Sequence, residues 1–207
     1  MRIALIDYGA GNLRSAARAL AEAGTVPEIT AGPEGLQRAD GIVVPGVGAF
    51  RPAMARLNAA GLVDPIRDAA RRGTPLVGIC LGMQLLFEES DEGRPTPGFG
   101  LISGVVRRLP EGVKVPHMGW NVLEGTANAL FRGLPERPYM YFVHSYVVRP
   151  ADSRVVIAEV TYGVRFPAIV RHGAIWGLQF HPEKSSRAGA RLLRNLVAEM
   201  AGARVRA

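Results

Sequence analysis

Residues 75–86, PLVGICLGMQLL, run from an apolar strand directly into a helix, with Cys80 at the junction. Glycines stand two residues before and two residues after it, at Gly78 and Gly82, and leave the cysteine uncrowded. A sharp strand-to-helix turn of this kind presents a nucleophile at the carboxyl end of a parallel sheet. The amino terminus of the helix favours a negatively charged sulfur. The stretch therefore predicts an α/β fold and a nucleophilic cysteine, against the commoner alternative of a buried structural cysteine.

Short apolar runs alternate with amphipathic stretches through the first half of the chain, as expected where strands are followed by helices. These segments are Ile3–Ile6, Leu13–Ala23, Ile42–Val44, Ala49–Ala60 and Leu76–Ile79. The alternation predicts βαβα units and hence a parallel sheet.

The second half of the chain contains segments typical of strands, separated by Gly, Pro and Asp residues that favour turns. These segments are Leu101–Leu109, Val113–Leu123, Tyr139–Val148, Arg154–Val160 and Ala168–Gln179. We expect mainly antiparallel strands here, a hairpin turn at His172, and a final helix over Ser186–Met200. No repeat or linker divides the sequence. We therefore expect one α/β domain, residues 1–207, with a central, mostly parallel sheet flanked by helices and an antiparallel extension.

The composition is that of an ordinary enzyme domain, with 48% hydrophobic and 21% charged residues in 207. The net charge of +7 raises the question of nucleic-acid binding. However, no aromatic residues interleave with the basic pairs Arg71-Arg72 and Arg107-Arg108, and an acidic partner or anionic metabolite explains the charge at least as well. A single cysteine excludes an internal disulfide. No apolar run is long enough to span a bilayer and the amino terminus is unlike a signal peptide, so we expect a cytoplasmic protein.

A candidate base and its orienting group occur in residues 177–185, GLQFHPEKS. A thiol nucleophile needs a general base, which His181 can supply, while Glu183 can hold the imidazole in one orientation. Pro182 favours an extended conformation at His181, so that both side chains project to the same side. Alone, His-Pro-Glu more often forms a surface turn. Together with the elbow at Cys80, it predicts a Cys-His-Glu triad.

Attack on a carbonyl group also needs backbone donors for the oxygen that gains negative charge. Leu81, directly after the nucleophile, offers one amide at the start of the helix. The second donor is expected from the turn Pro45–Gly48, where glycines let the main chain approach a ligand. A plain loop is the alternative for that turn.

Six segments together resemble the class I (triad) glutamine amidotransferases, and the resemblance covers essentially the whole chain. They are DYGAGNL (7–13), PGVGAF (45–50), GICLGMQ (78–84), PHMGWN (116–121), HSY (144–146) and QFHPEKS (179–185). The elbow and the His-Pro-Glu segment occur in many members of this family. The first and fourth segments resemble one branch of it, the glutaminase subunits that supply ammonia for the synthesis of imidazole glycerol phosphate.

The resemblance implies a flavodoxin-like amidotransferase fold and the hydrolysis of glutamine to glutamate and ammonia. Cys80 would attack the side-chain amide to form a thioester, and His181, oriented by Glu183, would protonate the departing ammonia. The oxyanion hole and the substrate contacts would involve Val47, Gly48, Leu81, Gln84 and Ser145.

The same resemblance implies a heterodimer with a (β/α)₈ cyclase subunit that uses the ammonia to make imidazole glycerol phosphate in histidine synthesis. Protonated ammonia is no longer nucleophilic, so the partner needs to cover its point of release. Asn12, Met118, Trp120 and Lys184 fit an interface role. For Met118 and Trp120, core packing within a strand is the alternative.

No cofactor and no metal ion are expected. Residues 9–11, Gly-Ala-Gly, begin like a dinucleotide-binding motif, but Arg14 occupies the position of its third glycine. The histidines are scattered and lack the close spacing of metal ligands.

Three functions stay open from the sequence. The first is the ammonia-producing subunit, and the second is another enzyme with a cysteine elbow, such as the glutaminase of pyridoxal phosphate synthase or a cysteine peptidase. The third is a scaffold without turnover. Residues 116–121 argue against the second function, and the intact Cys80, His181 and Glu183 argue against the third.

Overall fold

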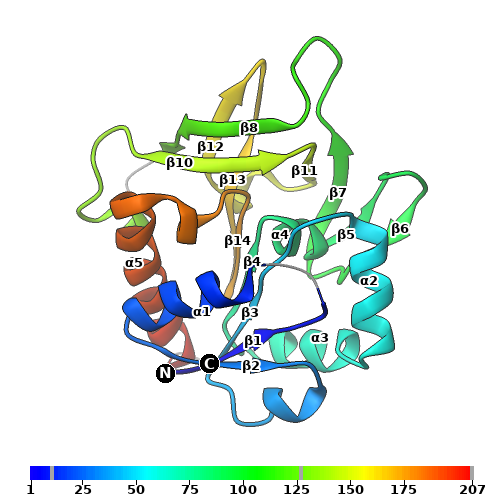
Figure 1. Ribbon diagram of the computed structural model, residues 1–207, viewed down its shortest axis with the longest axis vertical. Coiled ribbons are helices and arrows are strands. Elements are labelled where there is room, and N and C mark those ends of the chain that lie inside the picture. The colour runs from blue at the N-terminus through cyan, green and yellow to red at the C-terminus, as the bar shows by residue number, and fades with distance from the viewer. Residues whose placement is uncertain (10–11, 126–127, 206–207) are drawn as a thin grey trace.

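The computed structural model describes residues 1–9, 12–125 and 128–205 and contains an eight-stranded central sheet (Figure 1). The strands lie in the order β2 (Val26–Thr30), β1 (Arg2–Ile6), β3 (Gly41–Val44), β4 (Leu76–Ile79), β14 (Ile175–Leu178), β13 (Val164–His172), β12 (Val156–Tyr162) and β9 (Glu124–Gly125). Neighbours from β2 to β14 are parallel, and β13, β12 and β9 continue the sheet in antiparallel pairs. This arrangement confirms the predicted parallel sheet with an antiparallel extension.

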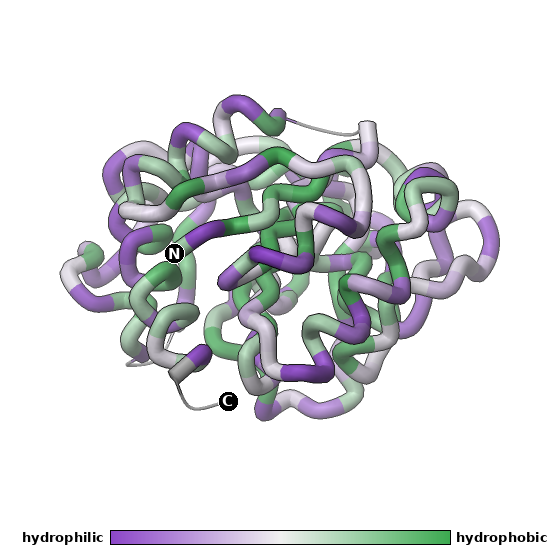
Figure 2. Tube along the Cα trace, turned by 90° about the horizontal axis from the view of Figure 1, so that it is seen from below, coloured by the Kyte–Doolittle hydropathy of each residue, from purple (hydrophilic) through white to green (hydrophobic). Residues whose placement is uncertain are grey.

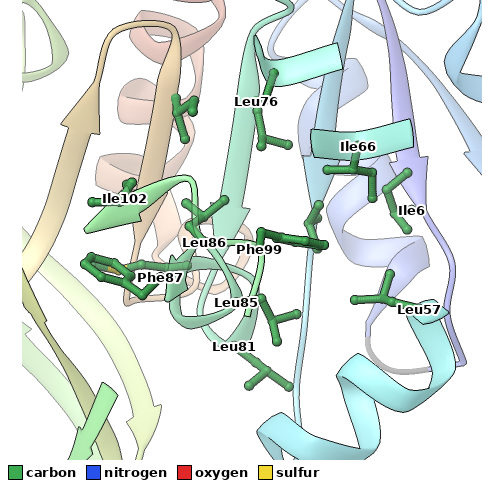
Figure 3. Close-up of a cluster of buried hydrophobic side chains, with 14 of the residues drawn as sticks. Ile6, Leu57, Ile66, Leu76, Leu81, Leu85, Leu86, Phe87, Phe99 and Ile102 are labelled. Atoms are coloured by element: carbon green, nitrogen blue, oxygen red, sulfur yellow. The ribbon is translucent and has the colours of Figure 1, made fainter. Parts of the chain in front are cut away.

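Helices cover both faces of this sheet. The helices α2 (Phe50–Ala59) and α3 (Val63–Arg71) pack on one face, and α1 (Leu13–Glu22) and α5 (Ser186–Val205) pack on the other. Because both faces are covered, β3, β4 and β14 are buried at every residue. Hydrophobic residues gather in the interior of the trace in Figure 2, and Figure 3 shows Leu57 of α2 and Ile66 of α3 beside Ile6 in one core cluster.

Two smaller sheets complete the fold. A four-stranded sheet has the order β11 (Tyr146–Pro150), β7 (Ile102–Arg108), β5 (Phe87–Ser90) and β6 (Thr96–Pro97). The ribbon formed by β8 (His117–Val122) and β10 (Tyr139–His144) is antiparallel and lies near the top of Figure 1. One face of this ribbon is buried and the other is exposed, in contrast to the parallel strands.

The structure corrects the sequence-based prediction at several points. The segment Ala168–Gln179 is not one strand, because it contains the end of β13, a turn at Gly173 and Ala174 directly after His172, and β14. β14 pairs in parallel with β4, which suits its complete burial between helices. The edge strand β2 and the helix α3 are absent from the prediction. β2 carries a proline and exposes Val26 and Ile29, so it lacks a strong strand pattern.

Short 3₁₀ helices link several of these elements. They are η1 (Pro33–Leu36), η2 (Ala129–Phe131), η3 (Ser153–Val155) and η4 (Pro182–Lys184). The α-helix after Cys80, α4 (Leu81–Leu85), has only five residues, whereas α5 continues beyond the predicted end at Met200. Within the described ranges, every helix is too short or too polar to cross a membrane.

Candidate active site

Cys80 stands at the sharp turn between β4 and α4, in the left-handed region of backbone conformation (φ 55°, ψ −109°). A residue other than glycine adopts this conformation at a cost of about 1–3 kcal/mol, which the surrounding packing must offset. A Cβ atom at Gly78 would overlap the backbone of Gly82, and one at Gly82 would overlap the carbonyl group of Val44. The predicted elbow is therefore present, and the two glycines allow its close packing.

His181 follows β14, the parallel neighbour of β4, so it lies at the same edge of the sheet as Cys80. Its Nδ1 atom is 2.8 Å from Oε1 of Glu183, and the two side chains are only 3% and 5% exposed. Because a carboxylate oxygen accepts, Nδ1 carries the hydrogen and donates it. Glu183 thus fixes both the tautomer and the orientation of the imidazole.

The contact between His181 and Cys80 is looser than a regular hydrogen bond. Among the described residues, Nε2 of His181 has no hydrogen-bond partner in good geometry, yet Cys80 lies close enough to raise the pKa of this histidine. The sulfur lies instead 3.8 Å from the carbonyl oxygen of Val143 and 3.9 Å from Nε2 of Gln179. Catalytic hydrogen bonds often tighten only once substrate is bound.

Cys80 nevertheless acts on the charge of His181. Burial lowers the pKa of His181, but Cys80 and Glu183 outweigh this effect and raise it to about 9. The imidazole therefore holds its second proton at neutral pH, which suits a general acid.

A pocket of about 350 Å³ opens beside Cys80, a size typical of small-molecule sites. The structure brings to this pocket all the residues predicted for the oxyanion hole and the substrate, although they belong to three separate segments. They are Val47, Gly48, Leu81, Gln84 and Ser145.

The two expected oxyanion donors do not both face the pocket. The Leu81 amide donates to the carbonyl oxygen of Gly46 at 3.4 Å. Since the C=O and N–H of one planar trans peptide point in opposite directions, the amide of Val47 is directed away from Leu81. The two expected donors are therefore not directed together at the pocket in this conformation.

Tyr8 supports the same turn, although no sequence pattern pointed to it. Its buried hydroxyl donates to the carbonyl oxygen of Pro45 at 2.9 Å. A Cβ atom at Gly46 would overlap this hydroxyl, so the glycine is needed for the close approach. Burial and the charge of Cys80 raise the pKa of Tyr8, which keeps its proton available for the bond.

Gln84 is held by two hydrogen bonds from its side-chain nitrogen. Nε2 donates to the carbonyl oxygen of Tyr146 at 3.0 Å and to Oε1 of Gln179 at 3.2 Å. Both amide hydrogens are thus used within the protein, which leaves Oε1 as the acceptor that a ligand can meet. Gln179 also directs its own nitrogen toward the Cys80 sulfur, so it connects the pocket with the nucleophile.

Glu92 is a further lining residue that sequence reasoning missed. Its Oε2 atom accepts a hydrogen bond from the amide of Phe50 at 2.7 Å, at the first residue of α2. The positive end of the helix dipole favours a carboxylate there. A carboxylate held at this position suits a ligand that carries an ammonium group.

Two buried histidines of the β8–β10 ribbon lie beside the pocket. Nδ1 of His117 is 3.0 Å from Nε2 of His144, and Nδ1 of His144 is 2.9 Å from the carbonyl oxygen of Tyr146. The carbonyl can only accept, so His144 donates from Nδ1 and accepts from His117. Burial lowers the pKa of His117 to about 4; burial and the neighbouring His117 lower that of His144 to about 3. Both rings are neutral at neutral pH.

The outer face of the same ribbon forms an exposed aromatic and apolar surface, which we call the docking surface. Met118 and Trp120 are 62% and 52% exposed, so the alternative of core packing is wrong for both. Trp120 contacts Tyr141 edge to face, and Nζ of Lys184 lies 5.9 Å from the centre of the Tyr141 ring. With Tyr139, these residues define the docking surface. Its composition is typical of protein interfaces.

Asn12 occupies the residue before α1, yet its side chain makes no capping hydrogen bond. It is partly exposed and lies near His181 and Glu183, where it lines a small cavity. Within the described part of the chain, no group of three or more His, Cys, Asp or Glu side chains is arranged to hold a metal ion.

Comparison with known proteins agrees with this geometry. The family model for class I glutamine amidotransferases matches residues 4–200. The chain is 50% identical over 194 residues to imidazole glycerol phosphate synthase subunit HisH of Moorella thermoacetica, covering 93% of this chain and 92% of the relative. It is 50% identical over 202 residues to the subunit of the same name from Geobacillus kaustophilus, covering 94% and 95%.

Solved structures show the same fold. A crystal structure of a glutamine amidotransferase superposes with a TM-score of 0.77 at 25% sequence identity and covers 97% of this chain and 98% of its own. A chain of PurLQS from Thermotoga maritima gives a TM-score of 0.75 at 21% identity, covering 96% and 98%. The second likeness concerns the fold alone.

Proposed function

Because this chain belongs to the class I glutamine amidotransferases, we propose that Cys80, His181 and Glu183 are its catalytic triad. The predicted fold class is confirmed. The chain is the glutaminase subunit of an imidazole glycerol phosphate synthase, in agreement with relatives that are 49–50% identical over nearly its whole length. The observation that best supports the triad is the strained elbow at Cys80 beside a buried His181–Glu183 pair.

In the proposed reaction, the Cys80 sulfur forms a bond to the side-chain amide carbon of glutamine, and negative charge moves to the amide oxygen. The C–N bond then breaks as His181 transfers its proton to the nitrogen, which leaves as ammonia. Water adds to the resulting thioester and gives a proton to His181. The C–S bond breaks and the new carboxyl group of the product gives its proton to solvent, so that glutamate departs and the enzyme returns to a thiolate beside a protonated imidazole.

The hydrogen bond from Leu81 to Gly46 implies low activity in the conformation described here. The Leu81 amide, which should stabilise the oxyanion, donates instead to the carbonyl oxygen of Gly46. The second expected donor, the amide of Val47, is directed away from it. Rotation of the Gly46–Val47 peptide would free the first donor and supply the second. We propose that binding of the synthase partner favours this rotation.

The pocket supports recognition of the amino-acid end of glutamine. Glu92 is the acidic residue of the lining, so we assign it to the α-ammonium group of the substrate. The free Oε1 of Gln84 can accept a further hydrogen bond from the substrate. We assign Val47, Gly48 and Leu81, which also line the pocket, to the side-chain amide of the substrate.

The partner is a second subunit of the synthase, and we propose that it is the cyclase that consumes the ammonia. The docking surface, with Met118, Trp120 and Lys184, and the uncapped Asn12 support an interface on this side of the triad. Exposed aromatic and methionine side chains are efficient contact residues. An interface here would cover the point at which ammonia leaves.

Glutamate release tests the proposal. The purified chain is mixed with the cyclase subunit and its nucleotide substrate, and glutamate is measured for the wild type and for Cys80→Ser. We expect slow release from the chain alone, fast release from the complex, and almost none from the variant. Equal release from the variant would refute Cys80 as the nucleophile.

A further inference from the structure

The side chain of Gln179 lies beside the nucleophile, although no step of the proposed reaction uses it. The residue follows β14 directly and is completely buried. Its Nε2 atom lies 3.9 Å from the Cys80 sulfur, and its Oε1 atom accepts a hydrogen bond from Gln84 at 3.2 Å. A buried amide that contacts both the nucleophile and a residue of the glutamine pocket is placed to act on the reacting atom itself.

The orientation of this amide follows from its neighbours. The carbonyl oxygen of Tyr146 only accepts, so the Gln84 atom that lies 3.0 Å from it must be the nitrogen. The same nitrogen faces Gln179, which must therefore present its oxygen to Gln84. The nitrogen of Gln179 is then left on the side of the Cys80 sulfur, where it can only donate.

The histidine pair of the β8–β10 ribbon holds the other end of this chain of hydrogen bonds. His144 donates from Nδ1 to the same carbonyl oxygen of Tyr146 at 2.9 Å, and its Nε2 accepts from His117 at 3.0 Å. Because their lowered pKa values keep both rings neutral, these donor and acceptor roles stay the same near neutral pH. Each hydrogen bond between the ribbon and the sulfur thus has one direction only.

The two contacts of the sulfur suit its two charge states. As a thiol, Cys80 can donate to the carbonyl oxygen of Val143, which is 3.8 Å away. As a thiolate it can only accept, and the nitrogen of Gln179 then offers a donor in addition to His181. Hydrogen bonds to a charged acceptor are shorter and roughly twice as strong as those between neutral groups. The amide of Gln179 therefore favours the thiolate over the thiol.

We propose that Gln179 is a further catalytic residue, whose side-chain amide donates a hydrogen bond to the Cys80 thiolate and so stabilises the nucleophile. The inference rests on the proposed function, because it concerns the nucleophile of that reaction. The same donor assists the last step, in which negative charge returns to the sulfur as it leaves the thioester. Gln84 and His144 are positioning residues, because they act on the sulfur only through this amide.

Alkylation by iodoacetamide tests this role in the free chain, because the reagent reacts with the thiolate and Cys80 is the only cysteine. In Gln179→Met the donor is lost, and a flexible side chain of similar length fills its space. We expect the pH at which alkylation reaches half its maximal rate to rise by about one unit. Gln37→Met, at an exposed position, is the matched control and should leave this pH unchanged.

The kinetic constants of the complex with the cyclase subunit give a second readout. In Gln179→Met we expect the turnover number for glutamate release to fall about tenfold. The KM for glutamine should change by less than about threefold, because Tyr146 still holds Gln84. An unchanged alkylation pH in Gln179→Met, whatever the effect on KM, would overturn the proposal and leave Gln179 as a support of the glutamine pocket.

The wild type keeps the test decisive if Gln179→Met does not fold. In an NMR titration, the side-chain amide signal of Gln179 should shift as Cys80 ionises and should stay constant in Cys80→Ser. The amide signal of Gln37 is the internal control. A Gln179 signal that stays constant in the wild type would overturn the proposal. Failure of the proposed function gives a different result, since the wild type would then release no glutamate that depends on Cys80, while alkylation and the NMR titration would be unaffected.

Discussion

His181, at the end of β14, and the pair His117 and His144, on the β8–β10 ribbon, are all buried, yet their pKa values move in opposite directions. Beside Cys80 and Glu183, the pKa of His181 rises to about 9 in spite of burial. In the ribbon, burial lowers the pKa of His117 to about 4 and contributes to a pKa of about 3 for His144. Burial is common to both regions, so the acidic neighbours decide the charge.

The two regions also differ in what they expose. The strands β4 and β14 are covered on both faces and lead to Cys80 and His181, the proposed nucleophile and base. The ribbon buries its histidines on one face and exposes Met118 and Trp120 on the other. The closed region is thus suited to chemistry and the half-open region to recognition.

Removing the carboxylate of Glu183, which sets His181 apart from the ribbon histidines, should have the largest effect on activity. In Glu183→Gln we expect the turnover number for glutamate release by the complex to fall about 10²–10⁴-fold, because the imidazole loses its orientation and its stabilised positive charge. The same exchange at the exposed Glu111 is the control. A change of less than about threefold in Glu183→Gln would show that the carboxylate is not part of the triad.

Truncating the exposed face of the ribbon should give the next largest effect. In Trp120→Ala we expect the dissociation constant for the cyclase subunit to rise about 10–100-fold, while the monomer stays folded. Calorimetric titration measures this change. Val26→Ala, at an exposed apolar residue on the edge strand β2 of the central sheet, should leave the affinity unchanged. Unchanged affinity in Trp120→Ala would remove Trp120 from the interface.

Breaking the hydrogen bond between the neutral His117 and His144 should lower the stability of the fold more than the rate of glutamine hydrolysis. His117→Leu leaves Nε2 of His144 without its donor, and we expect the free energy of unfolding to fall by about 1–3 kcal/mol. Urea denaturation monitored by circular dichroism measures the change. His172→Leu, at the exposed end of β13, should stay within about 0.5 kcal/mol of the wild type. A similar small change in His117→Leu would contradict the role given to the pair.

The contributions of the two regions to stability should change with pH in opposite directions. The lowered pKa values of His117 and His144 imply stability that is complete above pH 6.5 and is lost as the pH falls toward 4. The raised pKa of His181 implies stability that is complete below pH 6.5 and is lost as the pH rises toward 9.

Single variants can show which histidine causes the loss of stability at low pH and which causes the loss at high pH. His117→Leu should flatten the loss of stability on the acid side, and Glu183→Gln should flatten the loss on the alkaline side. Urea midpoints measured from pH 4 to 9 provide the test. An acid side that is as steep in His117→Leu as in the wild type would contradict the assignment.

The parts of the site that the sequence predicts are those encoded within one short segment. The elbow needs two glycines around Cys80, and the His181–Glu183 pair needs a proline between its members, so a few adjacent residues specify each. The mostly parallel sheet follows in the same way from apolar runs that alternate with helices.

The remaining parts depend on contacts between distant segments. Tyr8 and Glu92 join the site through hydrogen bonds to backbone groups 37 and 42 residues away, which no local pattern specifies. The contact between Leu81 and Gly46 depends on the orientation of one peptide group, and glycine permits more than one orientation. The sequence therefore predicts the donors but not whether they are available.

Trapping the thioester tests the central claim most directly. The complex is quenched in acid during turnover of glutamine, and its peptides are analysed by mass spectrometry. We predict a glutamyl group, removable by hydroxylamine, on the peptide that contains Cys80, and no such group in Cys80→Ser. Continued release of glutamate by the wild type without this adduct, together with an undiminished rate in Cys80→Ser, would contradict the account.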